Sequence, residues 1–149
     1  MTKLMYALAV GCLTAADKRK LDGFQCRCLR AIWGIKSSFI SRVSNFEVRQ
    51  ATQQCPATRL LERQMVLLYG EVARQPSSAT IRKSTFCEGS LRPATDRFVR
   101  RVGRPRLEWA RTAENIALRI FGSSRALESS LLSSEFSSAV SQYFSSTHP

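Results

Sequence analysis

The sequence predicts an all-α protein, a small helical bundle of about four helices with a long basic loop and a weak Ser-rich helix or tail at the end. Apolar residues recur at three- and four-residue steps, the spacing that places them on one face of a helix. Capping residues precede these segments, and glycine or proline follows them. With 149 residues, 44% of them hydrophobic, the chain can bury a core. We expect a helical domain at 1–122 and a marginal tail at 123–149.

The first helix is expected over residues 14–33. Thr14 is a good N-cap, Asp17 completes a capping box with it, and Gly34 ends the helix. The expected apolar stripe comprises Leu21, Phe24, Cys28, Leu29 and Ile32. Four cations fall away from this stripe, which makes them candidates for a solvated face or for nucleic-acid contact: Lys18, Arg19, Arg27 and Arg30.

Two further helices are predicted before residue 76. Ser44 and Glu47 have capping-box spacing and start a brief helix that ends near Gln54. Pro56 suits the first turn of the next helix, which stops at Pro76. Its apolar face comprises Leu60, Leu61, Met65, Leu68 and Val72. These stripes favour three helices around a common interior.

The pattern then weakens over residues 75–101, which we interpret as a long connection or binding loop with a turn at Cys87, Glu88 and Gly89. Helical spacing returns from Pro105 and closes at Gly122. Serine dominates the remaining residues, and its low helix propensity is the reason for expecting only a weak helix or tail there.

Charge is the strongest indication of function. The net charge of +12 and the pI of about 10.4 indicate a polyanionic partner, for which RNA, DNA and an anionic membrane surface are the candidates. The arginines are dense around residues 92–106, and Phe98 or Trp109 beside them can stack on bases, although for Trp109 we favour a place in the core. The candidate phosphate contacts there are Arg92, Arg97, Arg100, Arg101, Arg104 and Arg106.

The motifs of an enzyme are missing from the sequence. There is no phosphate-binding glycine loop and no paired aspartate for two-metal chemistry, and His148 is the one histidine. The five cysteines show no zinc-site spacing, so we expect reduced thiols and no metal or other cofactor: Cys12, Cys26, Cys28, Cys55 and Cys87.

Two alternatives remain open. Residues 103–106, Gly-Arg-Pro-Arg, partly match the core of an AT-hook, although Val102 stands where that motif carries arginine; a small free-standing DNA-binding protein, AT-hook-like or helix-turn-helix, would fit. The apolar residues 4–13 resemble a short signal peptide, and Ala9-Val10-Gly11-Cys12 resembles the cleavage site of an exported lipoprotein. The basic residues 18–20 hinder export, and we favour a buried N-terminal segment in an intracellular protein of the nucleus or cytoplasm, with no membrane contact.

Six segments follow one another along the chain: KLMYA at 3–7, LDGFQCRCLRAIWGI at 21–35, ISRVSNFEV at 40–48, LERQ at 61–64, YGEVAR at 69–74 and GRPRLEW at 103–109. Their order resembles the region downstream of the polymerase core in reverse transcriptases of non-LTR, LINE-type retrotransposons. The resemblance spans about residues 3–110.

The resemblance implies a helical, thumb- and linker-like region that helps to hold template RNA and primer, with the missing upstream polymerase region as a further partner. It implies that Asn45 starts a helix and that Arg104, Pro105 and Trp109 form a closing motif, which leaves Arg97, Arg100 and Arg101 as the better phosphate contacts. The implied core residues are Phe24, Cys28, Leu29, Ile32 and Ile35. Trp33 replaces the usual leucine, Gly70-Glu71-Val72 lacks a histidine, and the catalytic aspartates, endonuclease and Cys/His knuckle are missing. The expectation is a non-catalytic fragment.

Overall fold

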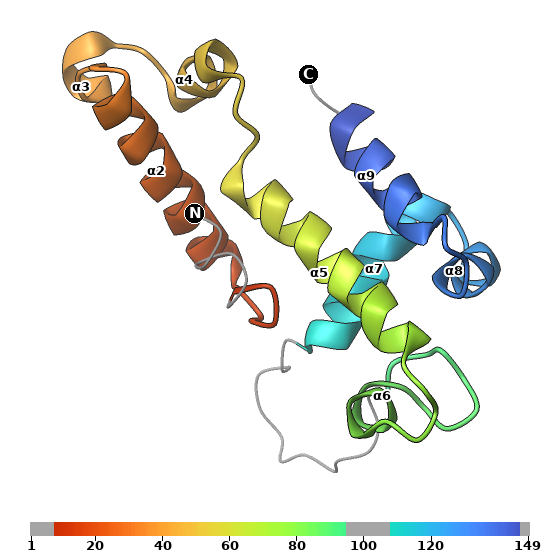
Figure 1. Cartoon of the computed structure of the whole chain (residues 1–149). Helices are drawn as coiled ribbons and strands as arrows, with labels where there is room; N and C mark the ends of the chain where they lie inside the picture. Colours follow the sequence, from red (N-terminus) through yellow and green to blue (C-terminus); the bar gives the residue numbers. More distant parts are fainter. Residues whose placement is uncertain (1–7, 95–107, 147–149) are drawn as a thin grey trace, which may run out of the picture. The chain divides into compact units, whose positions relative to one another are not determined.

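The computed structural model describes residues 8–94 and 108–146, and this part of the chain is all-α (Figure 1). It contains eight helices and one isolated β-bridge, between Phe86 and Pro93. The predicted class is confirmed, and the helices outnumber the expected four. The chain divides into two compact units, Leu13–Leu61 and a larger unit of Met1–Cys12 with Glu62–Pro149. Among the described helices, none combines the length and the apolar character needed to cross a membrane.

The smaller unit starts at the predicted caps. It contains α2 (Ala15–Ile32), α3 (Ser38–Ser41), α4 (Asn45–Thr52) and the beginning of α5 (Ala57–Arg74). Thr14 and Ser44 each accept a hydrogen bond from the backbone amide three residues later, and the carboxylates of Asp17 and Glu47 accept from the cap amides. Both predicted capping boxes are therefore confirmed.

These boxes make helix stability depend on pH. The hydrogen bonds from Thr14 lower the pKa of Asp17 below its usual 3.8, and those from Ser44 lower the pKa of Glu47 below its usual 4.5. Because the folded values are depressed, this stabilisation is complete above the unfolded pKa values and is lost as the pH falls through the folded ones. We expect helicity, measured by far-UV circular dichroism, to fall on acidification, and Glu47→Gln to reduce that fall more than the exposed control Glu88→Gln. An equal change in both variants would contradict this expectation.

The buried face of α2 differs from the predicted one. Its buried side chains are Gln25, Cys26 and Arg30, whereas Phe24 is exposed and Ile32 is 77% exposed. The expectation that Phe24 and Ile32 belong to the core is therefore wrong. The other members of the expected stripe and of the core that the resemblance implies are half-buried: Leu21, Cys28, Leu29 and Ile35.

Polar side chains on α2 explain this choice of face, because they supply partners for the start of α5. The Gln25 amide donates to the carbonyl of Cys55 at 2.7 Å and accepts from the amide of Ala57 at 2.8 Å. The Asp22 carboxylate accepts from the amide and hydroxyl of Thr58 at 3.0 and 2.9 Å. Free amides at a helix N-terminus need such acceptors, so α2 turns this polar side inward.

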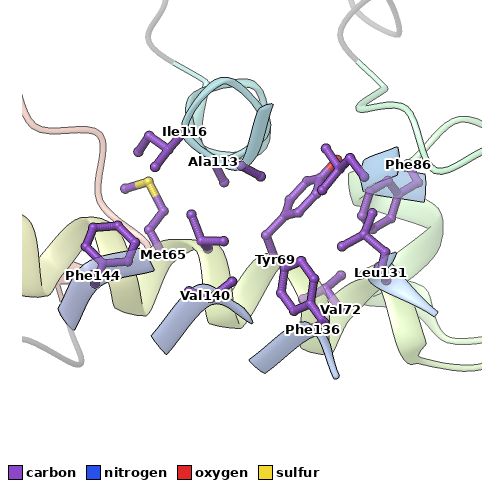
Figure 2. Packing of buried hydrophobic residues seen from close by; sticks show 14 residues of the cluster. Met65, Tyr69, Val72, Phe86, Ala113, Ile116, Leu131, Phe136, Val140 and Phe144 are labelled. Atoms are coloured by element: carbon purple, nitrogen blue, oxygen red, sulfur yellow. The ribbon is translucent and has the colours of Figure 1, made fainter. Parts of the chain in front are cut away.

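The larger unit has its core between α5, α7 (Trp109–Phe121), α8 (Ser124–Leu131) and α9 (Phe136–Ser146), with α6 (Thr80–Thr85) at the end of α5 (Figure 1). Met65, Tyr69 and Val72 project from α5 toward Ile116 of α7 on one side and toward Phe136 of α9 on another (Figure 2). Tyr69 and Phe86 have ring centroids 5.2 Å apart. Residues 75–94 were expected to be a loop, but they include helix α6 and the buried side chain of Phe86.

The Ser-rich segment is part of this core, and so the structure differs from the expected marginal tail. The serines lie mainly on the exposed sides of α8 and α9. The apolar residues between them are buried: Leu127, Leu131, Phe136, Val140 and Phe144. Burial of five large side chains contributes several kcal/mol, about 1.5–3 kcal/mol for each, which outweighs the weak helix propensity of serine.

Trp109 has the structural role that we favoured for it. Its indole nitrogen donates to the carbonyl of Ala9 at 2.7 Å, and its ring lies 6.3 Å from that of Tyr69. Helix α7 closes at Gly122, as predicted, with a φ of 79°. The predicted helix start at Pro105 lies outside the described residues.

Candidate nucleic-acid interface

A surface cavity of 1510 Å³ lies in the larger unit, between the segment that follows α5 and helix α8. Four cationic side chains line it, and two carboxylates, Glu88 and Glu128, oppose them. The cations are Arg82, Lys83, Arg92 and Arg125. Four serine hydroxyls complete the polar lining: Ser77, Ser78, Ser90 and Ser129. Guanidinium groups and hydroxyls are the donors that proteins offer to phosphate oxygens.

A tight turn after α6 holds one wall of this cavity. The amide of Cys87 donates to the carbonyl of Arg92 at 2.8 Å, and Gly89 adopts a φ of 73°. A left-handed residue at this position favours glycine because a Cβ atom would be strained there. The predicted turn at residues 87–89 is therefore confirmed.

The core anchors this turn on both sides. Phe86 is buried against Tyr69 before the turn, and the Tyr69 hydroxyl donates to the carbonyl of Leu91 at 3.2 Å after it. Burial raises the pKa of Tyr69 well above its ordinary value of 10.0, so the phenol keeps the proton that it donates. The backbone next to Arg92 is thereby held in place.

The cations of the cavity are only partly neutralised. Arg92 lies 3.9 Å from Glu128, and the Arg92 side chain is largely exposed while that of Glu128 is about half exposed, so this ion pair contributes little. One Arg82 nitrogen donates to the carbonyl of Gln75 at 2.6 Å, which orients the guanidinium without cancelling its charge. With four cations against two carboxylates, the cavity suits an anionic ligand.

The cavity gathers one predicted site residue, Arg92, with three cations that sequence reasoning missed. Arg82 and Lys83 are adjacent in a segment expected to be loop, and Arg125 lies in the segment expected to be tail. Because Arg82 and Lys83 are adjacent in the sequence, this basic pair could have identified them as candidates. The other candidates from the Arg-rich stretch lie outside the described residues: Arg97, Arg100, Arg101, Arg104 and Arg106.

The smaller unit holds the remaining four candidates on α2. Arg19 and Arg27 are exposed, and Lys18 is half-buried. Arg30 is only 6% exposed. Its guanidinium donates to the carbonyls of Lys36 and Val43 at 3.1 and 2.6 Å, so it joins the end of α2 to the chain around α3. Arg30 therefore has a structural role, and we retain Lys18, Arg19 and Arg27 as candidates.

These features define an all-α, basic protein whose larger unit carries a cationic cavity beside a core-anchored turn. In comparisons with known proteins, no family model, curated protein or solved structure matches the chain. Across residues 8–94 and 108–146, no three His, Cys, Asp or Glu side chains gather as metal ligands, and none of the five cysteines forms a disulfide.

Proposed function

We propose that the chain is a non-catalytic nucleic-acid-binding segment, similar to the post-polymerase region of LINE-type reverse transcriptases, which contacts the backbone of template or primer. The observation that carries this proposal is the cationic cavity around Arg92, with Arg82, Lys83 and Arg125. Neutralising phosphates with such groups releases counterions, which drives binding. The net charge of +12 adds long-range attraction.

The position of the cavity in the sequence supports the same proposal. Arg92 stands in the core-anchored turn, and five more arginines follow it by residue 106. These five arginines lie outside the described residues, and they add to the positive charge that follows Arg92 in the sequence. Serine hydroxyls lining the cavity add neutral donors to phosphate oxygens. This is recognition of the backbone, which carries no base sequence information.

The salt dependence of affinity tests the proposal. We expect Arg92→Gln with Arg125→Gln to weaken binding of RNA and DNA and to reduce the slope of log K against log salt by about 2, since each lost phosphate contact lowers it by about 1. Fluorescence anisotropy of labelled oligonucleotides at several salt concentrations measures this. The control is Arg111→Gln with Arg119→Gln, which removes the same charge from exposed positions on α7.

Two outcomes would contradict the proposal at different levels. Equal changes of affinity and salt slope in both double variants would show that the cavity is not part of the nucleic-acid interface. Absence of binding at low salt would reject nucleic-acid binding itself. A strong preference for A·T-rich duplex that Arg104→Gln abolishes would favour the second candidate, a free-standing AT-hook-like protein, which the Gly-Arg-Pro-Arg sequence at 103–106 suggests.

A further inference from the structure

Several large apolar side chains of the smaller unit are exposed near one end of α2. Three of them are aromatic: Trp33 is 60% exposed, Phe39 is 89% exposed and Phe46 is 56% exposed. Ile32 and Ile40 are exposed beside them in the sequence. Single exposed apolar residues are ordinary, but a group of them indicates a contact surface. We call Trp33, Phe39 and Phe46 the aromatic platform.

Arg30 holds together the three segments that carry the platform. Its guanidinium reaches from α2 to the Ser41 hydroxyl at the end of α3 at 3.4 Å and to the Asn45 side chain at the start of α4 at 3.3 Å. With its two carbonyl acceptors, these contacts fix the end of α2, α3 and the start of α4 against one another. In Figure 1, α3 lies at the end of α2 and α4 follows it. The hydrogen bonds of Arg30 therefore hold in place the segments that carry the three aromatic residues.

The charge of the residues near the platform in the sequence indicates which class of ligand binds there. Residues 27–49 contain five cations and one carboxylate, that of Glu47. Lys36 and Arg42 are exposed and stand between the aromatic residues in the sequence. This excess of positive charge disfavours a second copy of the same surface by repulsion. It favours a polyanion that also has flat apolar faces.

We infer that the aromatic platform binds single-stranded nucleic acid, with unpaired bases stacked on Trp33, Phe39 and Phe46 and the phosphates next to Lys36 and Arg42. This inference rests on the proposed function and specifies its ligand. Aromatic side chains stack on unpaired bases of any sequence, and nearby cations follow the backbone. In a duplex the base faces are covered by their neighbours, so the platform discriminates against paired strands.

An oligonucleotide with abasic positions separates stacking from phosphate contact. We expect the full-length chain to bind a single strand of about twelve nucleotides at least about 10-fold more tightly than the same backbone without bases, within the range given by base stacking. Replacing Trp33, Phe39 and Phe46 together by alanine should reduce the affinity for the normal strand to that for the abasic strand. The affinity for the abasic strand should not change.

Two further measurements make the test specific. Ile81→Ala removes an exposed apolar side chain from the larger unit and should leave both affinities unchanged. The difference in emission between the wild type and Trp33→Phe isolates Trp33 from the second tryptophan of the chain. That emission should be quenched by the normal strand and not by the abasic strand or a duplex.

The failure of this inference is distinguishable from that of the proposed function. Equal affinity for normal and abasic strands would overturn the stacking platform and leave backbone binding intact. Absence of binding to either strand would reject both. If sedimentation shows that the triple substitution dissociates an oligomer while the affinity for oligonucleotides is unchanged, the platform is an interface between copies and the inference is overturned.

Discussion

Gly70→Ala is expected to destabilise the larger unit by about 2 kcal/mol, the cost of overpacking a close-packed core. A Cβ atom at Gly70 would meet the ring of Phe136, with 2.7 Å to Cδ1 and an even closer approach to Cε1. That ring has no free space to move into, since it is buried, stacks on Phe121 at 5.4 Å and lies under the guanidinium of Arg74 at 5.7 Å. Chemical denaturation measures the loss of unfolding free energy.

Gly23→Ala is the matched control for this prediction. Gly23 also lies inside a helix, α2, but a Cβ atom there would meet nothing within 4 Å. The same substitution should stabilise the protein there by about 0.5–1 kcal/mol, because alanine loses less backbone entropy than glycine in a helix. The two variants should change stability in opposite directions. Stabilisation by both would contradict the close packing of α5 against α9.

Arg30→Met is expected to destabilise the smaller unit by about 3 kcal/mol, because hydrogen bonds from a buried charged group are worth more than neutral ones and their loss leaves buried acceptors unpaired. The substitution keeps much of the aliphatic volume and removes donors to the carbonyls of Lys36 and Val43. Arg30→Lys should recover only part of the loss, since one ammonium group cannot reproduce the guanidinium fork.

The control for Arg30 is its exposed neighbour on the same helix, Arg27. Arg27→Met should leave stability nearly unchanged and weaken nucleic-acid binding, whereas Arg30→Met should lower the unfolding temperature. Thermal unfolding followed by circular dichroism, with anisotropy at a temperature where both variants are folded, gives the two readouts. Equal stability losses in Arg27→Met and Arg30→Met would refute the structural role of Arg30.

Sequence reasoning succeeded where the structure depends on neighbours within four residues. The capping boxes of Thr14 and Ser44, the helix end at Gly122 and the turn at residues 87–89 lie where they were predicted. The prediction failed for the burial of Phe24 and Ile32, since apolar spacing alone cannot tell which face of a helix meets another helix. The polar partners that decide this, such as Cys55 for Gln25, lie 30 residues away.

Of the candidate phosphate contacts named from the sequence, Arg92 lines the cavity, whereas the other three cations that line it were not named: Arg82, Lys83 and Arg125. Arg125 was missed because low propensity suggested a tail after residue 122. The helices form there because their few large apolar side chains meet α5 and α7 in the core. Propensity is a local quantity, and tertiary burial overrides it.

The sequence by itself determined the all-α class, the starts of α2 and α4 and the strong positive charge, because caps, apolar spacing and charge are local or additive properties. Only the tertiary structure decided which side of α2 is buried, that Arg30 braces the smaller unit, and that the Ser-rich helices complete the core of the larger one. It also brought Arg92 and Arg125 into one cavity. These features depend on contacts between residues far apart in the chain, which helical periodicity does not specify.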